Sequence, residues 1–421
     1  MNSNSINPKI INYLYYLVCL LPIGFISGPL IPDLIIVISS IVFLYLSQKY
    51  KLWYLFKNKF VILLFIFYLI FFISSSLSEN ILFSFKSSLF YFRFIIFCVM
   101  ASFILKNKTA SDNLIFNFYF YTILVLIIDS YVQYLFGKNL IGLEKIIIAQ
   151  NQSIIDIKIT SFFGEDEILG SFLSKMLPII SALYFLKNEN RFNLKSLIFV
   201  TAIIISIFLT SERAAFIQAL MFLTLFFIFG NFKKKILFFI CLIVPLFLGV
   251  LVITNFDDNK KQRMIKSPIA NLKQGRISSH HQSHFITGIN MFKDQIMIGH
   301  GPKTFRILCK KYKHDDQSCS NHPHNTYIQL LAETGILGFG IVAFLFLFIS
   351  SMLIKNLYIK LRHSINVLNN DIISILCGIF VYIWPISPHG NFFNNWLSGM
   401  LFLQIAILIF LNSIKFVKLN K

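Results

Sequence analysis

Apolar runs of about 20 residues recur along the whole chain, and they limit its possible folds more than any other feature. A helix of that length spans the hydrocarbon core of a bilayer, which is about 30 Å thick. Because no water satisfies backbone N–H and C=O groups inside lipid, these runs are expected to be helices. Hydrophobic residues make up 56% of the 421 residues, which excludes an ordinary soluble domain. The sequence therefore predicts an all-α polytopic membrane protein.

The apolar runs predict about twelve transmembrane helices, with one large periplasmic loop between the ninth and the tenth. The expected helices are 10–27, 31–47, 60–77, 89–105, 114–136, 168–186, 196–210, 214–230, 236–254, 336–354, 372–388 and 396–413. The expected regions are helices 1 to 9 in 1–254, a periplasmic loop with short interfacial helices in 255–335, and helices 10 to 12 in 336–421. No small-residue cleavage site follows the first run, so we interpret it as an anchor and not a signal peptide.

The distribution of basic residues predicts the orientation of the chain. Lys and Arg number 38 against 18 Asp and Glu, and most of those in short connections fall on one side, such as Lys49, Lys51 and 233–235. By the positive-inside rule both termini are expected to be cytoplasmic and the stretch 255–325 external. Basic loops beside anionic lipid account for the net charge of +20, so nucleic acid is not an expected partner.

The stretch 255–325 is the most informative polar segment, because a long insertion on one face of a membrane protein is usually functional. It contains most of the nine histidines, namely His280, His281, His284, His300, His314, His322 and His324. The spacings of His281 with His284 and of His322 with His324 resemble those of metal ligands. A metal site remains only a competing interpretation, since neither a zinc-module Cys/His pattern nor a His-Glu-x-x-His motif accompanies them.

The six cysteines divide between the membrane and this loop. Four lie within predicted helices, where Cys behaves as a small apolar side chain: Cys19, Cys98, Cys241 and Cys377. Cys309 and Cys319 lie in the outer stretch, where an oxidising periplasm favours a disulfide that restrains the approach to His322. Two free thiols are the alternative.

Four charged residues lie near the expected outer boundary of the membrane: Arg93, Asp129, Lys175 and Arg213. Ionisable residues in spanning helices are functional candidates because their burial is costly. A plainer explanation exists for each, since Arg93 and Lys175 can extend to the headgroups and Asp129 can pair with one of them. Together they predict a polar layer where the phosphate or diphosphate of a lipid substrate would lie.

The outer stretch supplies two further basic residues beside glycines, Arg276 after Gly275 and Lys303 after Gly301. Glycine lets backbone amides approach an anion closely. The spacing matches neither a Walker A nor a dinucleotide-binding motif, so the signal for phosphate is weak.

A short helix is predicted between the outer stretch and the tenth span, in the sequence CSNHPHNTYIQLLAETG. Pro323 keeps His322 out of helical conformation. Asn325 or Thr326 is expected to cap a helix that Gly335 ends.

His324 would then stand at a helix N-terminus on the outer face. A neutral imidazole there can accept a proton from a hydroxyl group, and the helix amides could hold an anion. A purely structural histidine that caps the helix is the alternative.

These segments resemble the bacterial O-antigen ligase and O-antigen polymerase superfamily. The matching pieces are 128–137, 159–173, 210–214, 275–276, 291–302, 322–325, 333–335 and Gly338, and they extend over about half of the chain. Members are membrane glycosyltransferases that act on undecaprenyl-diphosphate-linked glycans at the periplasmic face. The resemblance therefore implies this activity and a place in the bacterial inner membrane.

The family pattern of His-Asn followed by Gly-x-x-Gly matches His324, Asn325, Gly335 and Gly338. The resemblance therefore selects His324 over His322 as the catalytic residue.

The resemblance also implies a role for each site residue. Arg213 and Arg276 would hold the donor diphosphate, and His324 would assist attack of an acceptor hydroxyl on the anomeric carbon. No metal and no other cofactor is implied. Supporting candidates are Arg93, Asp129, Lys175, Lys303 and Asn325.

Two functions within this family remain possible for the chain, and one function outside the family also remains possible. A ligase transfers a finished polymer to the lipid A core, whereas a polymerase joins repeat units; one dominant outer loop favours the ligase. A flippase or transporter also fits many helices with buried charges. However, we see neither paired halves nor charges at the bilayer midplane, which are common in transporters.

Overall fold

The structure of the chain is a computed structural model that describes residues 6–108, 113–151, 154–188, 193–232, 235–273, 279–316 and 318–419. Most of these residues are helical. The first six α-helices follow one another along the chain. These are α1 (Pro8–Ile26), α2 (Leu30–Lys49), α3 (Lys59–Ser76), α4 (Ile81–Ser88), α5 (Phe92–Lys108) and α6 (Leu114–Phe136), with a short 3₁₀ helix, η2 (Leu52–Lys57), before α3.

A two-stranded antiparallel hairpin of β1 (Ile146–Asn151) and β2 (Ile154–Lys158) follows, and then the 3₁₀ turn η3 (Ser161–Phe163). The remaining helices are α7 (Leu169–Lys187), α8 (Leu194–Leu209), α9 (Arg213–Phe229), α10 (Lys235–Phe256), α11 (Asp258–Lys261), η4 (Gln262–Lys266), α12 (Ser267–Lys273), α13 (Ser279–Asp294), α14 (Phe305–Tyr312), α15 (Thr326–His363), α16 (Asn370–Tyr382) and α17 (Asn395–Leu419). The expected all-α polytopic fold is therefore confirmed, with the hairpin as an addition that the sequence did not predict.

Local signals explain where several helices begin and end. The side chains of Asn7 and Asn58 accept hydrogen bonds from the first backbone amides of α1 and α3. Those amides have no partner inside the helix, so the Asn caps stabilise both starts. Gly137 ends α6 with φ 81°, a conformation that glycine adopts at little cost.

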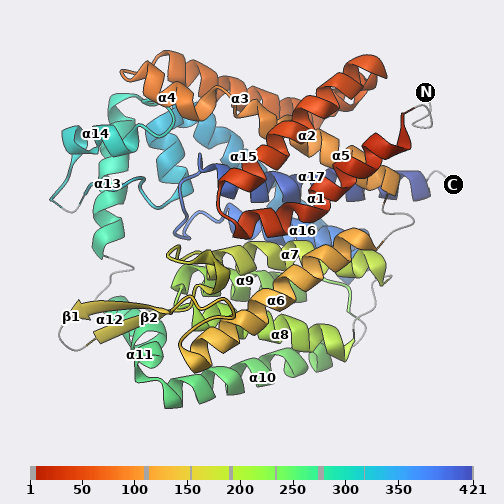
Figure 1. Cartoon of the computed structure of the whole chain (residues 1–421). Helices are drawn as coiled ribbons and strands as arrows, with labels where there is room; N and C mark the ends of the chain where they lie inside the picture. The colour runs from red at the N-terminus through yellow and green to blue at the C-terminus, as the bar shows by residue number, and fades with distance from the viewer. Residues whose placement is uncertain are drawn as a thin grey trace.

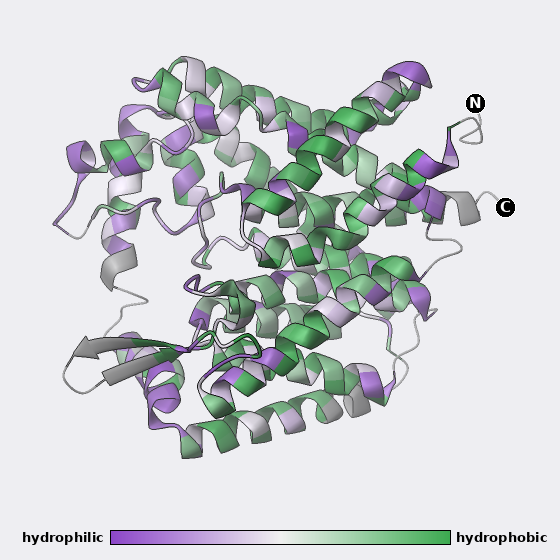
Figure 2. Ribbon diagram, in the orientation of Figure 1, coloured by the Kyte–Doolittle hydropathy of each residue, from purple (hydrophilic) through white to green (hydrophobic). Residues whose placement is uncertain are grey.

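The long helices pack side by side in one bundle (Figure 1). α16 packs against both α7 and α17, so it joins the helices α6–α10 to the group formed by α1–α5, α15 and α17. Both chain termini lie at one end of the bundle, and the hairpin and α11–α14 lie at the other. We call this second end the polar end, because hydrophilic residues gather there around the apolar bundle (Figure 2).

Eight helices within the described ranges are long and apolar enough to cross a membrane. The count becomes nine if α10 and the following helices, bent by 117°, form one broken span. Three more predicted spans are apolar but shorter, namely α8, α9 and α16. The multi-pass character is therefore confirmed, whereas the number of twelve crossings is not established by helix length.

The predicted helix 372–388 is too long at its outer end, because α16 stops at Tyr382. Pro385 and Pro388 lie just beyond this point, and proline lacks the N–H that would continue a helix. Residues 383–394 form a connection without helix, which we call the α16–α17 loop. This loop reaches the region of the candidate site.

The break predicted at Gly335 is confirmed. Asn325 caps α15 at its start, and Gly335 interrupts the helix with φ 62° and ψ −165°. A Cβ atom at Gly335 would lie 2.3 Å from the backbone of Met297, so only glycine fits this contact. The short first part of α15 is thereby held against the segment that follows α13.

Candidate functional site

His324 lies in the turn before α15, with an unusual backbone conformation. Its φ of 56° is uncommon for a residue other than glycine, and such conformations are concentrated at functional sites. The ring centroid of His324 is 4.1 Å from that of His322 and 5.3 Å from that of His284. Three imidazoles from α13 and the turn before α15 therefore gather at the polar end.

The start of α15 is fastened to the α16–α17 loop. The side chain of Asn325 accepts hydrogen bonds from the amides of Tyr327 and Ile328, and its Nδ2 donates to the carbonyl of Pro385 at 2.6 Å. The Tyr327 hydroxyl donates to the carbonyl of Ile383 at 2.7 Å. Asn325 therefore orients the turn that contains His324.

His389 joins this turn to α9. Its backbone N–H donates to the carbonyl of His324 at 3.0 Å, and its own carbonyl accepts a hydrogen bond from Nε2 of His322 at 3.1 Å. On the other side, Nε2 of Gln218 lies 3.4 Å from Nδ1 of His389 and donates to Ser387 at 2.9 Å. Gln218 belongs to α9, the helix that begins at Arg213.

Glu212 fixes the turn that precedes Arg213. Its carboxylate accepts hydrogen bonds from the amides of Gly170 and Ser171, the first residues of α7, at 2.6 and 2.9 Å. Burial raises the pKa of Glu212 to about 7, although these two bonds and the nearby Lys175 act in the opposite direction. A Cβ atom at Gly170 would lie 2.6 Å from Thr210 Oγ1, so the close approach of α7 to this turn requires glycine. The backbone at Arg213 is therefore tightly held.

Lys260 supports the same turn from α11. Its ammonium group is buried and donates hydrogen bonds to the carbonyls of Ile157 and Leu209, each at 2.5 Å, and to Ser211 Oγ at 2.6 Å. Leu209 is the last residue of α8, where a cation also complements the helix dipole. Ser211 has φ 63°, so Lys260 stabilises an unfavourable backbone conformation two residues before Arg213.

We expect Lys260→Met to lower the free energy of unfolding by about 1–3 kcal/mol, because it leaves buried hydrogen-bond acceptors without their donor. Thermal unfolding in detergent would measure the change. Lys266→Met is the matched control, since Lys266 is exposed on the same segment and its loss should alter stability by less than about 0.5 kcal/mol. Equal effects of the two substitutions would contradict the role assigned to Lys260.

Arg276 and its neighbour Gly275 lie outside the described residues, so the structure gives no position for the second predicted arginine. The side chain of His281 is likewise outside the description. Within the described ranges, no group of three or more His, Cys, Asp or Glu side chains is arranged to hold a metal ion.

Asp129 and Lys175 are both buried in the half of the bundle that contains α9. Asp129 accepts hydrogen bonds from Leu140 N, Asn139 Nδ2 and Ser161 Oγ, so it organises the connection after α6. Its hydrogen-bond partners are therefore residues of this connection, whereas Arg93 and Lys175 were the partners considered in the plainer explanation.

Lys175 donates a hydrogen bond to Ser171 Oγ at 2.7 Å, and its Nζ lies 5.7 Å from the centroid of the Tyr382 ring. The Tyr382 ring stacks on His389. Lys175 thus lies between the turn at Glu212 and the α16–α17 loop.

Arg93 and Lys303 form part of a different group. Arg93 makes an ion pair with Asp33 at 2.8 Å. Burial and the neighbouring Arg306 lower the pKa of Lys303, and Arg93 also contributes to that shift. Arg93 and Lys303, both predicted phosphate ligands, therefore lie near α5 and α14. Their partners are residues of that region and not of the turn before Arg213.

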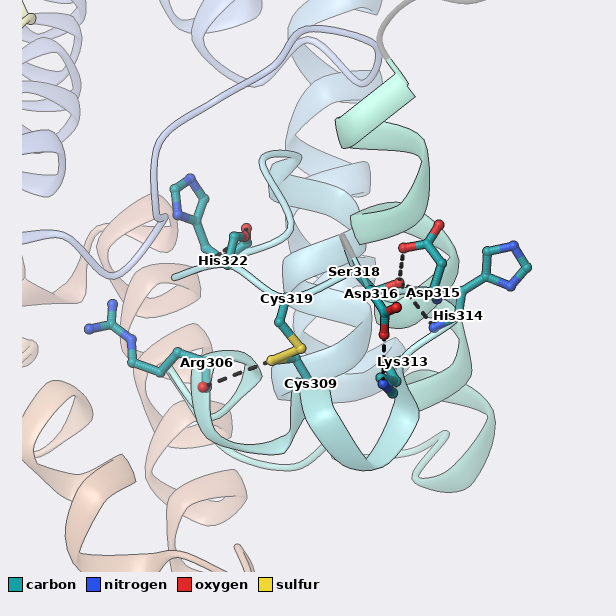
Figure 3. Close-up of a disulfide and its surroundings, with 10 residues drawn as sticks. Arg306, Cys309, Lys313, His314, Asp315, Asp316, Ser318, Cys319 and His322 are labelled. Carbon is teal, nitrogen blue, oxygen red and sulfur yellow. Dashed lines mark hydrogen bonds and ion pairs between the residues drawn. A yellow bond between two sulfur atoms is a disulfide. The ribbon is translucent and has the colours of Figure 1, made fainter.

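Cys309 and Cys319 form a disulfide, with Cα atoms 5.4 Å apart (Figure 3). The bond connects α14 to the segment that leads to His322 and His324. Figure 3 shows Arg306 and His322 on one side of the disulfide and His314 on the other. The disulfide therefore restrains the chain just before the three-histidine group.

We expect the double substitution Cys309→Ser and Cys319→Ser to lower the free energy of unfolding by about 2–3 kcal/mol, the loop-closure entropy for a short closed loop. Thermal unfolding would measure it, and limited proteolysis would show faster cleavage between the two positions. Reduced wild-type protein should behave like the double variant. Unchanged stability and cleavage in both samples would rule out a structural role for this bond.

Two residues were missed by sequence reasoning. Glu212 lies directly before Arg213, but nothing in the sequence indicates that its carboxylate caps α7. His389 lies in the short connection expected between the predicted helices 372–388 and 396–413, but no motif marked it as a candidate. The two prolines, Pro385 and Pro388, were the available signal, since they favour a loop that places a histidine at the polar end.

The sequence was compared with known protein families and with curated proteins. Residues 197–343 match the sequence profile described as O-antigen ligase. The matched range extends from α8 into α15 and includes Arg213, Arg276 and His324. No curated protein matches the chain at a significant level. The profile match agrees with the polytopic helical fold, and it supports the resemblance of the chain to the O-antigen ligase and polymerase superfamily.

Proposed function

We propose that the chain is a metal-independent glycosyltransferase of the bacterial inner membrane that ligates O-antigen to lipid A core. The donor is a glycan linked to undecaprenyl diphosphate, and the acceptor is a sugar hydroxyl of the core. The site lies on the periplasmic side, and both termini are cytoplasmic.

In the proposed reaction the acceptor oxygen forms a new bond to the anomeric carbon of the donor glycan. The bond from that carbon to the diphosphate oxygen breaks, and undecaprenyl diphosphate leaves with the electron pair. His324 accepts the proton of the hydroxyl group. Arg213 and Arg276 stabilise the negative charge of the departing diphosphate through bidentate hydrogen bonds.

The observation that carries this proposal is the set of contacts from His324 through His389 to Gln218. His389 hydrogen-bonds the backbone of His324, and its side chain meets Gln218 on the helix that begins at Arg213. Residues far apart in sequence therefore meet through one loop at the polar end. A basic group and an imidazole on the same face suit a reaction that pairs an anionic leaving group with a hydroxyl nucleophile.

Ligation is favoured over polymerisation by the distribution of polar structure. Among the described residues, the stretch after α10 carries four helices, α11 to α14, besides η4, whereas the stretch after α6 carries a hairpin and the short turn η3. One dominant outer insertion was the sequence feature that pointed to the ligase.

A deletion strain distinguishes the two activities. Loss of a ligase leaves undecorated lipid A core, whereas loss of a polymerase leaves core that bears a single repeat unit. Gel analysis of lipopolysaccharide would show the pattern, with a plasmid copy of the gene as the control. Core carrying one unit would replace the ligase proposal with the polymerase.

A transport function is tested with purified protein. Reconstituted protein should form product from defined donor and acceptor lipids without any ion gradient. Movement of the donor across the bilayer without product would contradict glycosyl transfer.

A further inference from the structure

The loop before α14, residues 298–304, is fastened on two sides. The backbone N–H of Gly301 donates to the carbonyl of Glu333 at 2.8 Å. On the other side, the Ser78 hydroxyl donates to the carbonyl of His300 at 2.6 Å. The loop is therefore held between the α3–α4 connection and the first part of α15, and its backbone has little freedom.

Lys303 lies in this loop with an unfavourable backbone conformation. Its φ of 62° is uncommon for a residue other than glycine, and such conformations are concentrated at functional sites. The carboxylate of Glu333 accepts hydrogen bonds from the N–H groups of Lys303 and Phe305, the second at 3.0 Å. Thr304 Oγ1 donates to the carbonyl of Gly301 at 2.6 Å and closes the turn. The direction in which the Lys303 side chain leaves the backbone is therefore fixed.

Two arginines lie near the Lys303 ammonium. Burial lowers the pKa of Lys303 most, and the positive charges of Arg306 and Arg93 lower it further. The carboxylate of Glu333 acts in the opposite direction, but it already accepts the amide hydrogen bonds of the loop. Asp33 is paired with Arg93 at 2.8 Å. We call the three basic residues of this group, Arg93, Lys303 and Arg306, the α14 cations.

Two of the α14 cations have donors that no protein group uses. Within the described ranges, neither the Lys303 ammonium nor the Arg306 guanidinium takes part in a hydrogen bond or an ion pair. Lys303 is half-buried but its Nζ is open to solvent, and Arg306 is exposed. Like charges that lie together repel each other, and an anion bound between them removes this cost. A phosphate group is the anion that suits the planar donors of a guanidinium.

The α14 cations and His324 lie toward opposite ends of one short helix. The first part of α15 begins just after His324, and from residue 324 to residue 333 it rises about 13 Å at 1.5 Å per residue. The α16–α17 loop, which leads to Arg213, meets the start of this helix at Asn325, whereas the cations gather near Glu333. In Figure 1, α14 lies beside α4, and α9 lies in the other half of the bundle. A phosphate on these cations is therefore distinct from a diphosphate on Arg213.

We propose that Lys303 and Arg306, in the positive field of Arg93, bind a phosphate group of the acceptor glycolipid. This inference rests on the proposed transfer from a lipid diphosphate to lipid A core, because both lipids then carry phosphate. Arg213 and Arg276 hold the donor, and the α14 cations hold the acceptor with its hydroxyl group toward the catalytic imidazole. No bond to the acceptor phosphate forms or breaks, so the α14 cations are positioning residues.

The double substitution Lys303→Gln and Arg306→Gln removes both charges and keeps polar side chains. With saturating donor, the KM for lipid A core should rise about 10- to 100-fold, the effect of losing charge-assisted hydrogen bonds. The kcat and the donor KM should stay within about twofold of the wild type, because acceptor binding is lost and not the chemical step. Initial rates of purified protein in nanodiscs measure these constants. Lys293→Gln is the charge control, since Lys293 is exposed on α13, and it should behave like the wild type.

The acceptor itself supplies a readout that a packing role would not change. Lipid A core treated with hydrofluoric acid loses its phosphate groups and keeps its sugars. With the wild type, the KM of this acceptor should be raised about as much as that of intact core with the double variant. The double variant should not distinguish the two acceptors, because it lacks the groups that would bind the phosphate.

Direct binding makes the test independent of glycan transfer. Lipid A core should bind wild-type protein in nanodiscs about tenfold more tightly than the double variant, after subtraction of binding to empty nanodiscs. Farnesyl diphosphate, a probe of the donor site, should bind both proteins equally. If the wild type transfers no glycan, the proposed function fails, and this comparison still decides whether the cations bind an acceptor phosphate.

Each other result would overturn the proposal. A donor KM raised as much as the acceptor KM, or more, would assign the phosphate to the donor. Equal losses with intact and dephosphorylated core would show that the α14 cations support only the fold. Unchanged KM values, or equal binding of lipid A core by the wild type and the double variant, would show that no acceptor phosphate meets them.

Discussion

His324→Ala is expected to reduce glycan transfer by about 100- to 10,000-fold, the range that a general base contributes. The loss should appear in kcat with both substrates saturating, because the side chain acts on the hydroxyl proton and not on the donor lipid. Transfer of a defined lipid-linked glycan by purified protein in nanodiscs would measure it. The variant should accumulate in the membrane as the wild type does, since His324 is only partly buried.

His314→Ala is the matched control for this result. His314 lies in the same polar region but is exposed and points away from the disulfide side occupied by His322 (Figure 3). It should transfer glycan at the wild-type rate. Near-normal transfer by His324→Ala would remove His324 from the mechanism, and equal losses in both variants would point to a general effect on the outer segment.

Arg213→Ala is expected to lower transfer at least about 100-fold, because a guanidinium group that stabilises a departing diphosphate acts where charge develops. Arg213→Lys should restore only part of the activity, since an ammonium keeps the charge but not the planar pair of donors. Steady-state kinetics with varied donor would separate a loss in kcat from weaker donor binding. The acceptor KM should stay unchanged.

Arg362→Ala controls for the loss of one positive charge. Arg362 lies in the last turn of α15, at the opposite end of this 38-residue helix from His324. Its removal should leave transfer unaffected. An Arg213→Ala variant with full activity would show that the diphosphate binds elsewhere, and the group around Arg93 and Lys303 would then be the alternative.

The helices were predictable because their signal is local. Apolar runs and short polar breaks identify each span, and α6 begins and ends at the residues expected, 114 and 136. The capped start at Asn325 and the break at Gly335 followed from the same local rules. The error at 372–388 was also local, since hydropathy extends through Pro385 while backbone hydrogen bonding does not.

The site could be predicted only in part, because its contacts join distant segments. Arg213 and His324 were selected by resemblance, but the α16–α17 loop between them became visible only in three dimensions. Asp129 was a candidate because buried charge is costly, yet Asn139 and Ser161 satisfy it locally. Lys260 lies in a polar segment with no motif, and only the fold brings its ammonium under Ser211.

The most direct test of the central claim is an experimental structure of the protein with undecaprenyl diphosphate bound in a nanodisc. The account predicts the diphosphate between Arg213 and the α16–α17 loop, with Arg276 on its phosphate oxygens and the His324 imidazole facing the sugar-side phosphate. A diphosphate bound instead against Arg93 and Lys303, with Arg213 and His324 in contact with neither phosphate, would contradict it.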